Sequence, residues 1–259
     1  MKISVVTPCL NASDHIEVAI RSVMGQSYPY YEHVVVDGGS NDGTVGILER
    51  YPHLIWVSEP DSGQSNAMNK GFDMTTGDIV VYLNADDYFL PDAFATVIPH
   101  FEHGARFVVG DVLVKMDGGY FLNSPRTEFR EMVRHWEPNA FPNNPVGYFY
   151  TRDIQQSLPF NEDNHLMMDV EFLLDASLQT PFTKINEVLG VYRAFGDTKT
   201  LQVQVDPDYW QESSFRVLDR FVTELPEAEQ PGFLADRAAG LNMRREEALR
   251  SIGEGLKTA

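Results

Sequence analysis

Two adjacent carboxylates, Asp86 and Asp87, come directly after a short apolar run at residues 79–83. The run is rich in β-branched side chains and too short for a typical helix, so it predicts a buried, parallel strand. Open α/β sheets bind ligands just beyond the carboxyl ends of their strands, and both acids fall there. Neighbouring acids repel each other, so a cation or a hydroxyl-rich ligand would explain the pair. The alternative is that Asp87 only caps a helix that begins near Pro91.

The pair predicts a site for a metal ion and a phosphate at the mouth of a nucleotide-binding sheet. Because carboxylates offer only oxygen ligands, the ion would be Mn²⁺ or Mg²⁺ rather than zinc, which prefers His and Cys. Short acidic motifs also occur by chance, so the prediction depends on where the neighbouring elements end.

Strands and helices alternate over the first hundred residues, and this order would bring the ends of four strands together. The predicted strands are residues 2–7, 33–36, 54–57 and 79–83, and the predicted helices are residues 12–24, 43–49 and 64–72. The alternation predicts a parallel sheet with helices on its faces. The strand ends are polar or turn-forming: Thr7-Pro8, Asp37-Gly38-Gly39-Ser40, Ser58-Glu59-Pro60-Asp61 and Asn84-Ala85-Asp86-Asp87. We expect these four ends to converge on one edge of the sheet.

The pattern changes after Asp87. The elements predicted there are a helix at 92–101, a strand at 107–114, a hairpin that continues into residues 120–122, and a helix at 166–178. A stretch rich in Pro and Asn, residues 137–145, is interpreted as a loop over the site. Residues 201–259 are expected to be mostly helical, and no change of composition is sharp enough to prove a separate domain.

The composition excludes several classes of protein. The 259 residues are 43% hydrophobic, enough for a sizeable core, and the formal net charge is −18. A chain this acidic should be repelled by nucleic acid and by anionic membrane surfaces, so no nucleic-acid partner is expected. Its one cysteine, Cys9, is interpreted as a small core residue. Without a signal-peptide pattern or a run long enough to span a bilayer, a cytoplasmic protein is expected.

Several separate blocks of the sequence resemble family 2 glycosyltransferases of the GT-A fold. The blocks are Thr7-Pro8-Cys9-Leu10-Asn11, Val34 to Thr44, Asp61 to Gly71, Leu83 to Asp87, Pro159 to Glu162, Met168 to Phe172 and Val191-Tyr192-Arg193. They occur in order over about residues 1–200, which is far more specific than any single motif. The resemblance implies an α/β fold with a Rossmann-like sheet that binds the nucleotide-sugar, a mixed C-terminal acceptor portion and a helical tail.

The activity that the resemblance implies is inverting, metal-dependent transfer of a sugar from a nucleotide-diphospho-sugar to a hydroxyl acceptor. A UDP-sugar is favoured, with dTDP- and GDP-sugars left open. The acceptor would be a glycan or a lipid-linked sugar in cell-surface polysaccharide assembly. Residues 237–250 carry basic and apolar side chains, so peripheral contact with a membrane, or with a second subunit in a homodimer, is left open beside a solvated terminal helix.

The resemblance also assigns the residues that bind the donor. It places the metal ion, Mn²⁺ or Mg²⁺, on Asp87, the ribose or the metal-bound water on Asp86, and the nucleotide base on Asp37. A divalent cation would stabilise the charge that grows on the diphosphate as the glycosidic bond breaks. The full set of predicted donor-binding residues is Thr7, Pro8, Asn11, Asp37, Gly39, Asp61, Gln64, Asn84 and Asp86. For Asp37 and Gly39 the alternative is a tight turn, and for Asp61 it is a helix cap.

Asp169 is the predicted general base. Inverting transfer requires a carboxylate that takes the proton of the acceptor hydroxyl as this oxygen attacks the anomeric carbon. The alternative for Asp169 is a helix N-cap, and Glu171 is the second candidate base. Asp111, Glu171 and Arg193 are the candidates on the acceptor side, although a hairpin-edge acid would explain Asp111 equally well.

The sequence departs from the family pattern at two positions that concern the donor. Many relatives have His two residues after the Arg of the closing strand, where it can ligate metal, and this chain has Phe195. Met68 stands near where some relatives have a donor-binding Arg. The metal ion would then be held by one carboxylate, phosphates and water, and it would bind together with the donor.

Three other functions compete with this interpretation. A Rossmann dehydrogenase needs a glycine fingerprint after the first strand, where this chain has Pro8 to Ser13, and a sugar nucleotidyltransferase needs a Gly-rich basic loop there. A catalytically silent nucleotide-sugar-binding protein needs no base and stays open. We expect a glycosyltransferase domain at residues 1–200, divided into a nucleotide-sugar-binding half at 1–90 and an acceptor half at 91–200, and a helical extension at 201–259.

Overall fold

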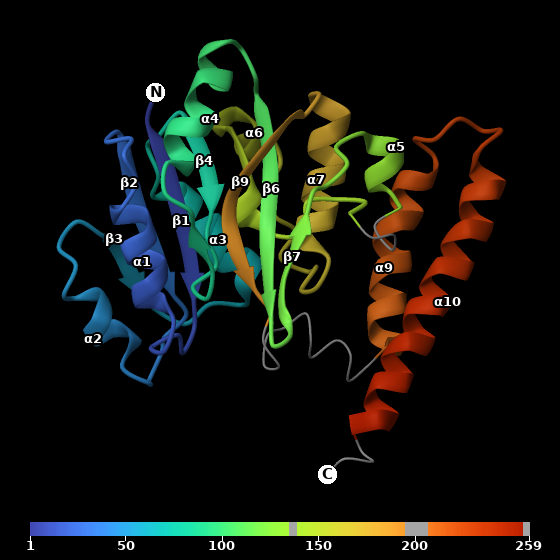
Figure 1. The fold of residues 1–259 in the computed structure, drawn as a ribbon, viewed down its shortest axis with the longest axis horizontal. Helices are drawn as coiled ribbons and strands as arrows, with labels where there is room; N and C mark the ends of the chain where they lie inside the picture. Colours follow the sequence, from blue (N-terminus) through green and yellow to red (C-terminus); the bar gives the residue numbers. More distant parts are fainter. Residues whose placement is uncertain (135–138, 195–206, 256–259) are drawn as a thin grey trace.

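The computed structural model describes residues 1–134, 139–194 and 207–255 of the chain. Within them the strands form one sheet in the order β3-β2-β1-β4-β8-β6-β9-β5, and β7 pairs with β6 (Figure 1). The strands are β1 (Ile3–Cys9), β2 (Tyr31–Asp37), β3 (Ile55–Ser58), β4 (Ile79–Tyr82), β5 (Tyr88–Phe89), β6 (Phe107–Met116), β7 (Gly119–Asn123), β8 (Tyr148–Thr151) and β9 (Thr183–Arg193).

Helices cover both faces of this sheet. The helices are α1 (Ile16–Met24), α2 (Thr44–Leu48), α3 (Gln64–Asp73), α4 (Ala93–Glu102), α5 (Phe129–Met132), the 3₁₀ turn η1 (Pro145–Gly147), α6 (Arg152–Ser157), α7 (Met168–Gln179), α9 (Pro207–Val222) and α10 (Gln230–Gly255). Helices α1 and α4 pack in the core on one face, and α3, α6 and α7 pack in the core on the other (Figure 1).

The four strands β3-β2-β1-β4 are parallel to one another, as the sequence predicted. The central residues of β1, β2 and β4 are buried on both faces of the sheet, which is why these three strands read as continuous apolar runs, whereas β3 at the end of the row is partly exposed. The register places Cys9 opposite Asp37 and Asp37 opposite Ser58, so the carboxyl ends of β1, β2 and β3 lie at one edge. Leu83 donates its backbone N–H to the carbonyl of Val6 (2.9 Å), which brings the end of β4 to the same edge.

Helix α3 lies close to the sheet because Gly71 has no side chain. A Cβ atom at Gly71 would lie 2.4 Å from Cγ1 of Val6 and 3.2 Å from Cγ2 of Val36. Atoms at the shorter distance overlap, so a larger residue would push α3 away from β1 and β2. Since α3 begins with Gln64 at the edge where the strands end, this contact also sets the position of Gln64.

Among the elements after β4, the sequence analysis missed β5, α5, β8 and α6, and it expected only the last three residues of β9. Strand β8 pairs antiparallel with β4 and with β6, so the expectation that β4 is a parallel strand is right only on the side of β1. The run Tyr148-Phe149-Tyr150 of β8 is fully buried and shows no alternation of polar and apolar residues, which removes the usual strand signal. Strand β5 has only two residues, too few for any periodicity to show.

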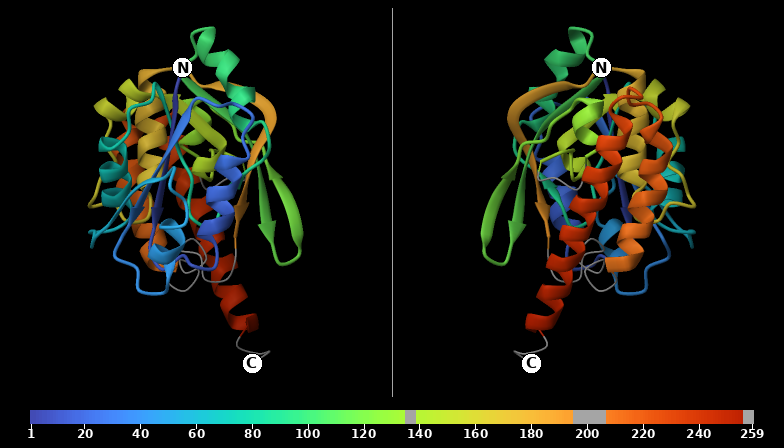
Figure 2. Two further views of the ribbon diagram at one scale, coloured as in Figure 1. Left: turned by 90° about the vertical axis from the view of Figure 1, so that its left-hand side faces the viewer. Right: turned by 90° about the vertical axis from the view of Figure 1, so that its right-hand side faces the viewer.

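The predicted helix at 12–24 begins later than expected, at Ile16. The backbone N–H groups of Ala12 and Ser13 donate instead to the side chains of Thr44 (2.9 Å) and Asp42 (2.9 Å). This tether between the two loops keeps residues 12–15 outside the helix proper. The predicted hairpin is confirmed as β6 and β7, and Figure 2 shows it projecting from the body of the molecule.

Helices α9 and α10 pack against α5 and α7 through one apolar cluster. Its buried members are Met132, Val133, Met167, Val170, Leu174, Val217, Leu218, Phe221, Val222, Leu225 and Phe233. The expectation that the C-terminal residues are mostly helical is therefore confirmed for residues 207–222 and 230–255. Across the described residues, no helix combines the length and the apolar composition that crossing a bilayer requires.

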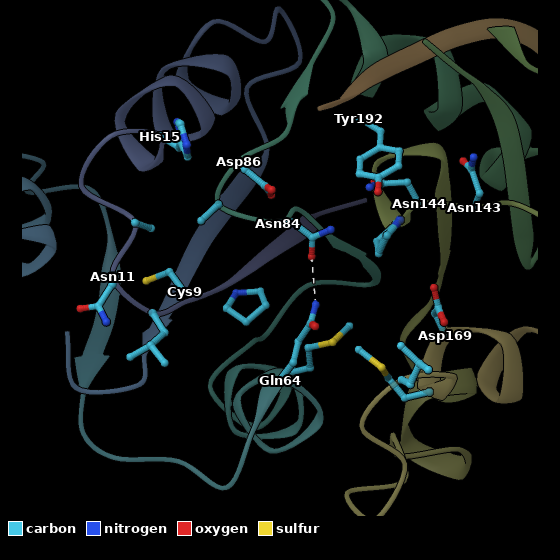
Figure 3. A pocket seen from close by; sticks show the side chains of 18 residues that line it. Cys9, Asn11, His15, Gln64, Asn84, Asp86, Asn143, Asn144, Asp169 and Tyr192 are labelled. Atoms are coloured by element: carbon cyan, nitrogen blue, oxygen red, sulfur yellow. Dashed lines mark hydrogen bonds between the residues drawn. The ribbon is translucent and has the colours of Figure 1, made fainter. Parts of the chain in front are cut away.

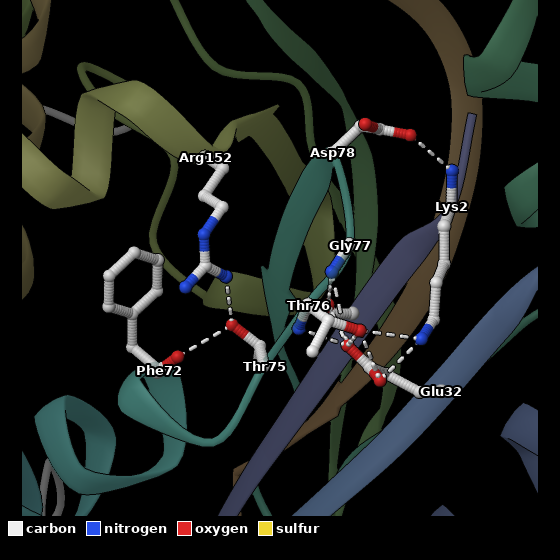
Figure 4. Close-up of polar contacts among 9 residues, drawn as sticks. Lys2, Glu32, Phe72, Thr75, Thr76, Gly77, Asp78 and Arg152 are labelled. Carbon is white, nitrogen blue, oxygen red and sulfur yellow. Dashed lines mark hydrogen bonds and ion pairs between the residues drawn. The ribbon is translucent and has the colours of Figure 1, made fainter.

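At the opposite edge of the sheet, Glu32 ties β1, β2 and the turn before β4 together (Figure 4). Its Oε1 accepts hydrogen bonds from the hydroxyl of Ser4 and the backbone N–H of Thr76 (2.6 Å each), and from the N–H of Gly77 (3.1 Å). Its Oε2 accepts from Nζ of Lys2 (2.6 Å). Burial alone would raise the pKa of Glu32, but hydrogen bonds from Lys2, Ser4 and Thr76 outweigh it and lower the pKa to about 2.

Glu32→Gln should lower the free energy of unfolding near neutral pH by about 2 kcal/mol, because a charged acceptor of several hydrogen bonds is lost. Since folding lowers the pKa of Glu32, the carboxylate stabilises the protein above its unfolded-state pKa of about 4.5, and this stabilisation is lost as the pH falls toward about 2. As the pH falls over that range, the free energy of unfolding should therefore decrease less for the variant than for wild type. Urea unfolding at neutral and acidic pH measures both effects.

Glu102→Gln, an exposed carboxylate at the end of α4, is the control and should unfold like wild type at neutral pH. If Glu32→Gln were as stable as wild type at neutral pH, the network around Glu32 would contribute nothing to the fold.

Candidate active site

A cavity of about 370 Å³ opens at the edge of the sheet where β1 and β4 end. Its lining residues are Pro8, Cys9, Leu10, Asn11, Ala12, His15, Gln64, Met68, Asn84, Ala85, Asp86, Asn143, Asn144, Pro145, Leu166, Met168, Asp169 and Tyr192 (Figure 3). The lining includes residues 143–145, so this part of the predicted loop over the site is confirmed, whereas residues 137 and 138 lie outside the described residues. The cavity therefore lies between the first part of the chain, whose strands are parallel, and the second part, whose strands pair in both directions.

The acids of the Asp86-Asp87 pair have different surroundings. Asp86 lines the cavity, whereas Asp87 is only 1% exposed and is not among the lining residues. Oδ2 of Asp87 accepts hydrogen bonds from Nδ2 of Asn84 (3.1 Å) and of Asn144 (2.8 Å), and Oδ1 accepts from the backbone N–H of Arg193 (2.8 Å). Burial and the charge of Asp86 raise the pKa of Asp87 to about 7, although these three hydrogen bonds oppose the shift.

The helix-cap explanation for Asp87 is wrong. Helix α4 begins at Ala93, and its N-cap position is Asp92. No group of three His, Cys, Asp or Glu side chains that could hold a metal ion is found among the described residues. Asp86 and Asp87 can therefore supply only part of a coordination shell.

The carboxyl end of β9 holds the loop that contains Asp86 and Asp87, here called the acidic loop, in place. Besides its backbone contact with Asp87, Arg193 donates from Nε to the backbone carbonyl of Asp86. The predicted closing strand at residues 191–193 is the end of β9, which pairs with β5 through Val191 and Tyr88. Arg193, a predicted acceptor-side residue, thus contacts the acidic loop itself. Phe195, where relatives have a His, lies outside the described residues.

Asp37 is buried at the end of β2 and is held by donors of the protein itself. Its carboxylate accepts hydrogen bonds from the N–H groups of Gly39 (3.3 Å) and Ser40 (3.0 Å), from the hydroxyl of Ser40, and from the hydroxyl of Ser58 (2.6 Å). Burial would raise the pKa of Asp37, but the hydrogen bonds from Ser40 and Ser58 outweigh it and lower the pKa. Gly39 has a φ of 88°, a conformation that favours glycine. Asp37 therefore shapes the turn after β2, and it is not among the lining residues.

Four of the other predicted donor-binding residues line the cavity: Pro8, Asn11, Gln64 and Asn84. Gln64 donates from Nε2 to Oδ1 of Asn84 (3.2 Å), which connects the start of α3 to the end of β4 (Figure 3). The structure therefore brings these residues together with Asp86, as the convergence of strand ends predicted.

Thr7, Gly39 and Asp61 are not among the lining residues. Oγ1 of Thr7 lies 2.9 Å from Nε2 of His33 in the interior of the sheet. Asp61 accepts a hydrogen bond from the N–H of Gly63 (2.9 Å), the N-cap residue of α3, so its local role resembles the predicted helix cap.

Asp169 lies in the first turn of α7 and borders the cavity on the side opposite Asp86 (Figure 3). The N-cap of α7 is Met167, so the alternative that Asp169 is the N-cap is wrong. Oδ1 of Asp169 accepts a hydrogen bond from the N–H of Val170 (2.9 Å), which fixes the direction of its side chain.

Glu171 and Asp111, the other acidic candidates, are held in ion pairs outside the cavity lining. Oε1 of Glu171 lies 2.6 Å from Nη1 of Arg220, and Oε2 accepts from Nδ2 of Asn164 (2.8 Å). Oδ1 of Asp111 lies 2.5 Å from Nζ of Lys184. The structure therefore does not bring either acid into the cavity with Asp169.

The sequence analysis missed three polar residues of the cavity: His15, Asn143 and Asn144. Asn144 donates to Asp87 and accepts from the N–H of Val146 (2.9 Å), and Oδ1 of Asn143 is buried without a hydrogen-bond partner in the described structure. The only signal for the two asparagines was the richness of their stretch in Pro and Asn. No spacing rule connects Asn144 to an acid 57 positions earlier in the chain.

Known proteins resemble this chain in sequence. A family model described as glycosyl transferase family 2 matches residues 4–173. TuaG of Bacillus subtilis (strain 168), a glycosyltransferase named for teichuronic acid biosynthesis, is 38% identical over 96 residues, which are 35% of this chain and 38% of that protein. A glycosyltransferase of Mycobacterium bovis (strain BCG / Pasteur 1173P2), named for PGL/p-HBAD biosynthesis, is 28% identical over 210 residues, 74% of this chain and 77% of that protein. The chain thus matches little more than a third of the length of TuaG.

Solved structures show the same fold. The structure of S. aureus TarS 1–349 in complex with UDP-GlcNAc has a TM-score of 0.70 at 19% identity and covers 93% of this chain and 72% of that one. The mannosyltransferase PcManGT from Pyrobaculum calidifontis, in complex with GDP-Man and Mn²⁺, has a TM-score of 0.61 at 20% identity and covers 100% of this chain and 80% of that one. The predicted fold class, a GT-A sheet with a mixed second half and a helical tail, is confirmed.

Asp37→Asn should lower the free energy of unfolding by about 2–3 kcal/mol, because the amide keeps the size of the side chain but loses the charge that Ser40 and Ser58 stabilise. Ser58→Ala removes one donor and leaves the carboxylate charged, so a loss of only about 1 kcal/mol is expected. Urea unfolding of both variants near neutral pH makes the comparison. Equal losses in the two variants would show that the charge of Asp37 does not hold the turn after β2.

Proposed function

The chain belongs to glycosyltransferase family 2, and on that premise we propose that it transfers a sugar, with inversion and with a divalent cation, from a nucleotide-diphospho-sugar to a hydroxyl acceptor. The observation that carries the proposal is the position of two carboxylates on opposite sides of one cavity. Asp86 follows β4 on one side, and Asp169 lies in the first turn of α7 on the other (Figure 3).

Asp169 would act as the general base of this reaction. In an inverting transfer the acceptor oxygen attacks the face of the sugar opposite the leaving diphosphate, so the base and the diphosphate must lie on different sides of the sugar. With the diphosphate near Asp86, a sugar in the cavity would lie between the two acids. Glu171 is less suited, because its carboxylate is held by Arg220 and Asn164.

The residues at the end of β4 fit a divalent cation. Asp86 and Asp87 offer only oxygen ligands, which suit Mn²⁺ or Mg²⁺. Asp87 is a buried acid whose pKa is raised to about 7, and no ion pair to it is found within the described part of the chain, so a cation nearby would stabilise its charged form. Its three hydrogen bonds leave room for one more contact, since a carboxylate accepts about four. When bound, the cation would stabilise negative charge on the diphosphate leaving group.

The donor that we favour is a UDP-sugar, with GDP- and dTDP-sugars as the alternatives. The fold is shared with TarS, solved with UDP-GlcNAc, and with PcManGT, solved with GDP-Man and Mn²⁺. The base would lie near the turn that Asp37 organises, and Asn11 and Gln64 would border the donor. Because the curated relatives are named for teichuronic acid and for PGL/p-HBAD biosynthesis, we propose a glycan or a lipid-linked sugar as the acceptor.

Oδ1 of Asn143 supports the acceptor part of this proposal. This atom is buried at the cavity and lacks a hydrogen-bond partner in the described structure, which is costly for a polar group. A sugar hydroxyl could donate to it. We further propose the division into a donor half at residues 1–90 and an acceptor half at 91–200, and the cavity supports the first boundary, since Asn11, Gln64 and Asp86 come before it and Asn143 and Asp169 after it.

Arg237 is the one basic residue of the segment 237–250 whose contacts are described, and these contacts give little support to a membrane role for the segment. Nη1 of Arg237 lies 2.5 Å from Oδ1 of Asp219, and its guanidinium lies 4.6 Å from the ring centre of Phe215. These contacts hold Arg237 against α9. A solvated terminal helix, the alternative considered from the sequence, is therefore the explanation that we favour.

Asp87→Asn should weaken UDP binding in the presence of Mn²⁺ at least tenfold, because it removes the charge that a cation would stabilise. UDP binding without Mn²⁺ should change little. In wild type, protons compete with the cation, so UDP binding with Mn²⁺ should strengthen as the pH rises through about 7.

Calorimetry with UDP, with and without Mn²⁺, measures these effects. Asp86→Asn is the matched variant, and the acid whose loss abolishes the effect of Mn²⁺ is the principal ligand. Metal dependence that survives in both variants would refute the proposed metal site.

Asp169→Asn should abolish most transfer while the protein folds and binds donor as wild type does. The amide keeps the shape of the side chain but cannot take the acceptor's proton, so the rate should fall by roughly 10²–10⁴-fold. Wild type, incubated with UDP-, dTDP- and GDP-sugars and Mn²⁺, should release nucleotide with one of them, and that donor is used for the variants. Turnover, donor affinity and melting temperature are measured together.

Glu171→Gln is the control. It should lower the melting temperature, because it breaks the pair with Arg220, and it should change turnover much less than Asp169→Asn does. If Glu171→Gln loses transfer while Asp169→Asn keeps it, the base is Glu171. If wild type releases nucleotide from no sugar donor, the chain is a silent binding protein and the proposed function is wrong.

A further inference from the structure

The acidic lining of the cavity does not suit an anionic donor unless positive charge offsets it, and a lining residue can add to what the proposed cation supplies. Asp86 and Asp169 are both acidic, and the proposed donor adds the negative charge of its diphosphate. Among the described residues that line the cavity, none is Lys or Arg, and Met68 stands where some relatives have a donor-binding Arg. His15 is the one residue of this lining whose side chain can carry a positive charge.

The backbone of His15 is fixed, whereas its side chain is available. His15 occupies the N-cap position of α1, where its N–H donates to the carbonyl of Ala12 (3.0 Å) and its carbonyl accepts from Val18 (3.0 Å). Its half-buried imidazole makes no hydrogen bond or ion pair with any residue that the structure describes. Figure 3 shows it on the same side of the cavity as Asp86.

Two basic residues of elements that border the cavity, Arg193 of β9 and Lys70 of α3, are already used in contacts. Arg193 donates to the backbone carbonyl of Asp86 and lies outside the lining. Nζ of Lys70 lies 2.8 Å from Oε1 of Glu59. These contacts leave His15 as the residue best placed to meet a phosphate oxygen.

We propose that His15 is a donor-binding residue, whose imidazole donates a charge-assisted hydrogen bond to the diphosphate of the nucleotide-sugar. The inference rests on the proposed function. A protonated imidazole offsets part of the negative charge that Asp86, Asp169 and the diphosphate bring together, and it does so from the side on which the leaving group lies. It thereby supplies a charge that a lining Arg or Lys would otherwise provide.

The test compares UDP with uridine, because only the first carries the diphosphate. His15→Gln can still donate a hydrogen bond but has no charge, so it should bind UDP about tenfold to a hundredfold more weakly than wild type. Its affinity for uridine should stay within about twofold of wild type. His15→Arg restores the charge and should bind UDP within about threefold of wild type. Calorimetry without added metal removes any contribution of a cation to these differences.

His100→Gln, a half-buried histidine of α4 outside the cavity lining, is the control for loss of an imidazole and should bind like wild type. Binding of GDP and guanosine, and of dTDP and thymidine, is measured in parallel with UDP and uridine. The variants are then compared with the nucleotide and nucleoside that wild type binds most tightly.

Three outcomes would overturn the inference. If His15→Gln binds the nucleotide as tightly as wild type, His15 does not contact the diphosphate. If it loses affinity for nucleoside and nucleotide alike, and His15→Arg does not rescue either, His15 contacts the base or supports the fold. If wild type binds none of the nucleotides and releases none from sugar donors, the proposed function fails, and that result is distinct from the first two.

Discussion

The buried carboxylate of Asp87 is the contact on which the rest of the site depends. It accepts hydrogen bonds from three segments: the end of β4 through Asn84, the loop before β8 through Asn144, and the end of β9 through Arg193. A buried carboxylate without donors would be costly, so these segments must meet for Asp87 to be buried as an anion. The same contact therefore joins the parallel half of the sheet to the mixed half. It also fixes Asp86 at the cavity, because Arg193 holds the backbone carbonyl of Asp86 as well.

Two buried acids at this edge of the sheet are shifted in opposite directions, and the difference separates their roles. Asp37 is surrounded by hydroxyl and N–H donors that lower its pKa, so it stays charged and serves the turn after β2 without help from a ligand. Asp87 has fewer donors and an acidic neighbour, Asp86, and its pKa rises to about 7. Its charge state near neutral pH therefore depends on what else is bound. Of the two, Asp87 is the acid whose charged form a cation nearby would stabilise, and Asp37 is the acid that shapes the turn after β2.

The sequence predicted the parts of the site that follow from periodicity. Continuous apolar runs located the parallel strands, and their polar ends placed Asn84 and Asp86 at one edge. Asn144 could not be found in this way, because its contact with Asp87 depends on how the loop before β8 lies over the sheet. The ion pair of Glu171 could not be predicted either, because its partner Arg220 lies 49 positions later in the chain, on a helix that packs against α7. Tertiary docking of this kind leaves no local pattern, and it decided which of the acidic candidates face the cavity.

The central place of β1 in the sheet has a consequence for how the chain reaches this structure. β1 pairs with β2 on one side and with β4 on the other, and its contacts with the segment before β4 join residues 76 positions apart. Parallel pairing over such a separation is slow, because chain entropy is lost before the contacts form. Until β4 has been synthesised, one long edge of β1 stays unpaired with apolar residues on both faces, and an edge of that kind invites aggregation. The strand that brings Pro8 and Asn11 to the cavity is thus also the strand that has to be protected while the nascent chain is incomplete.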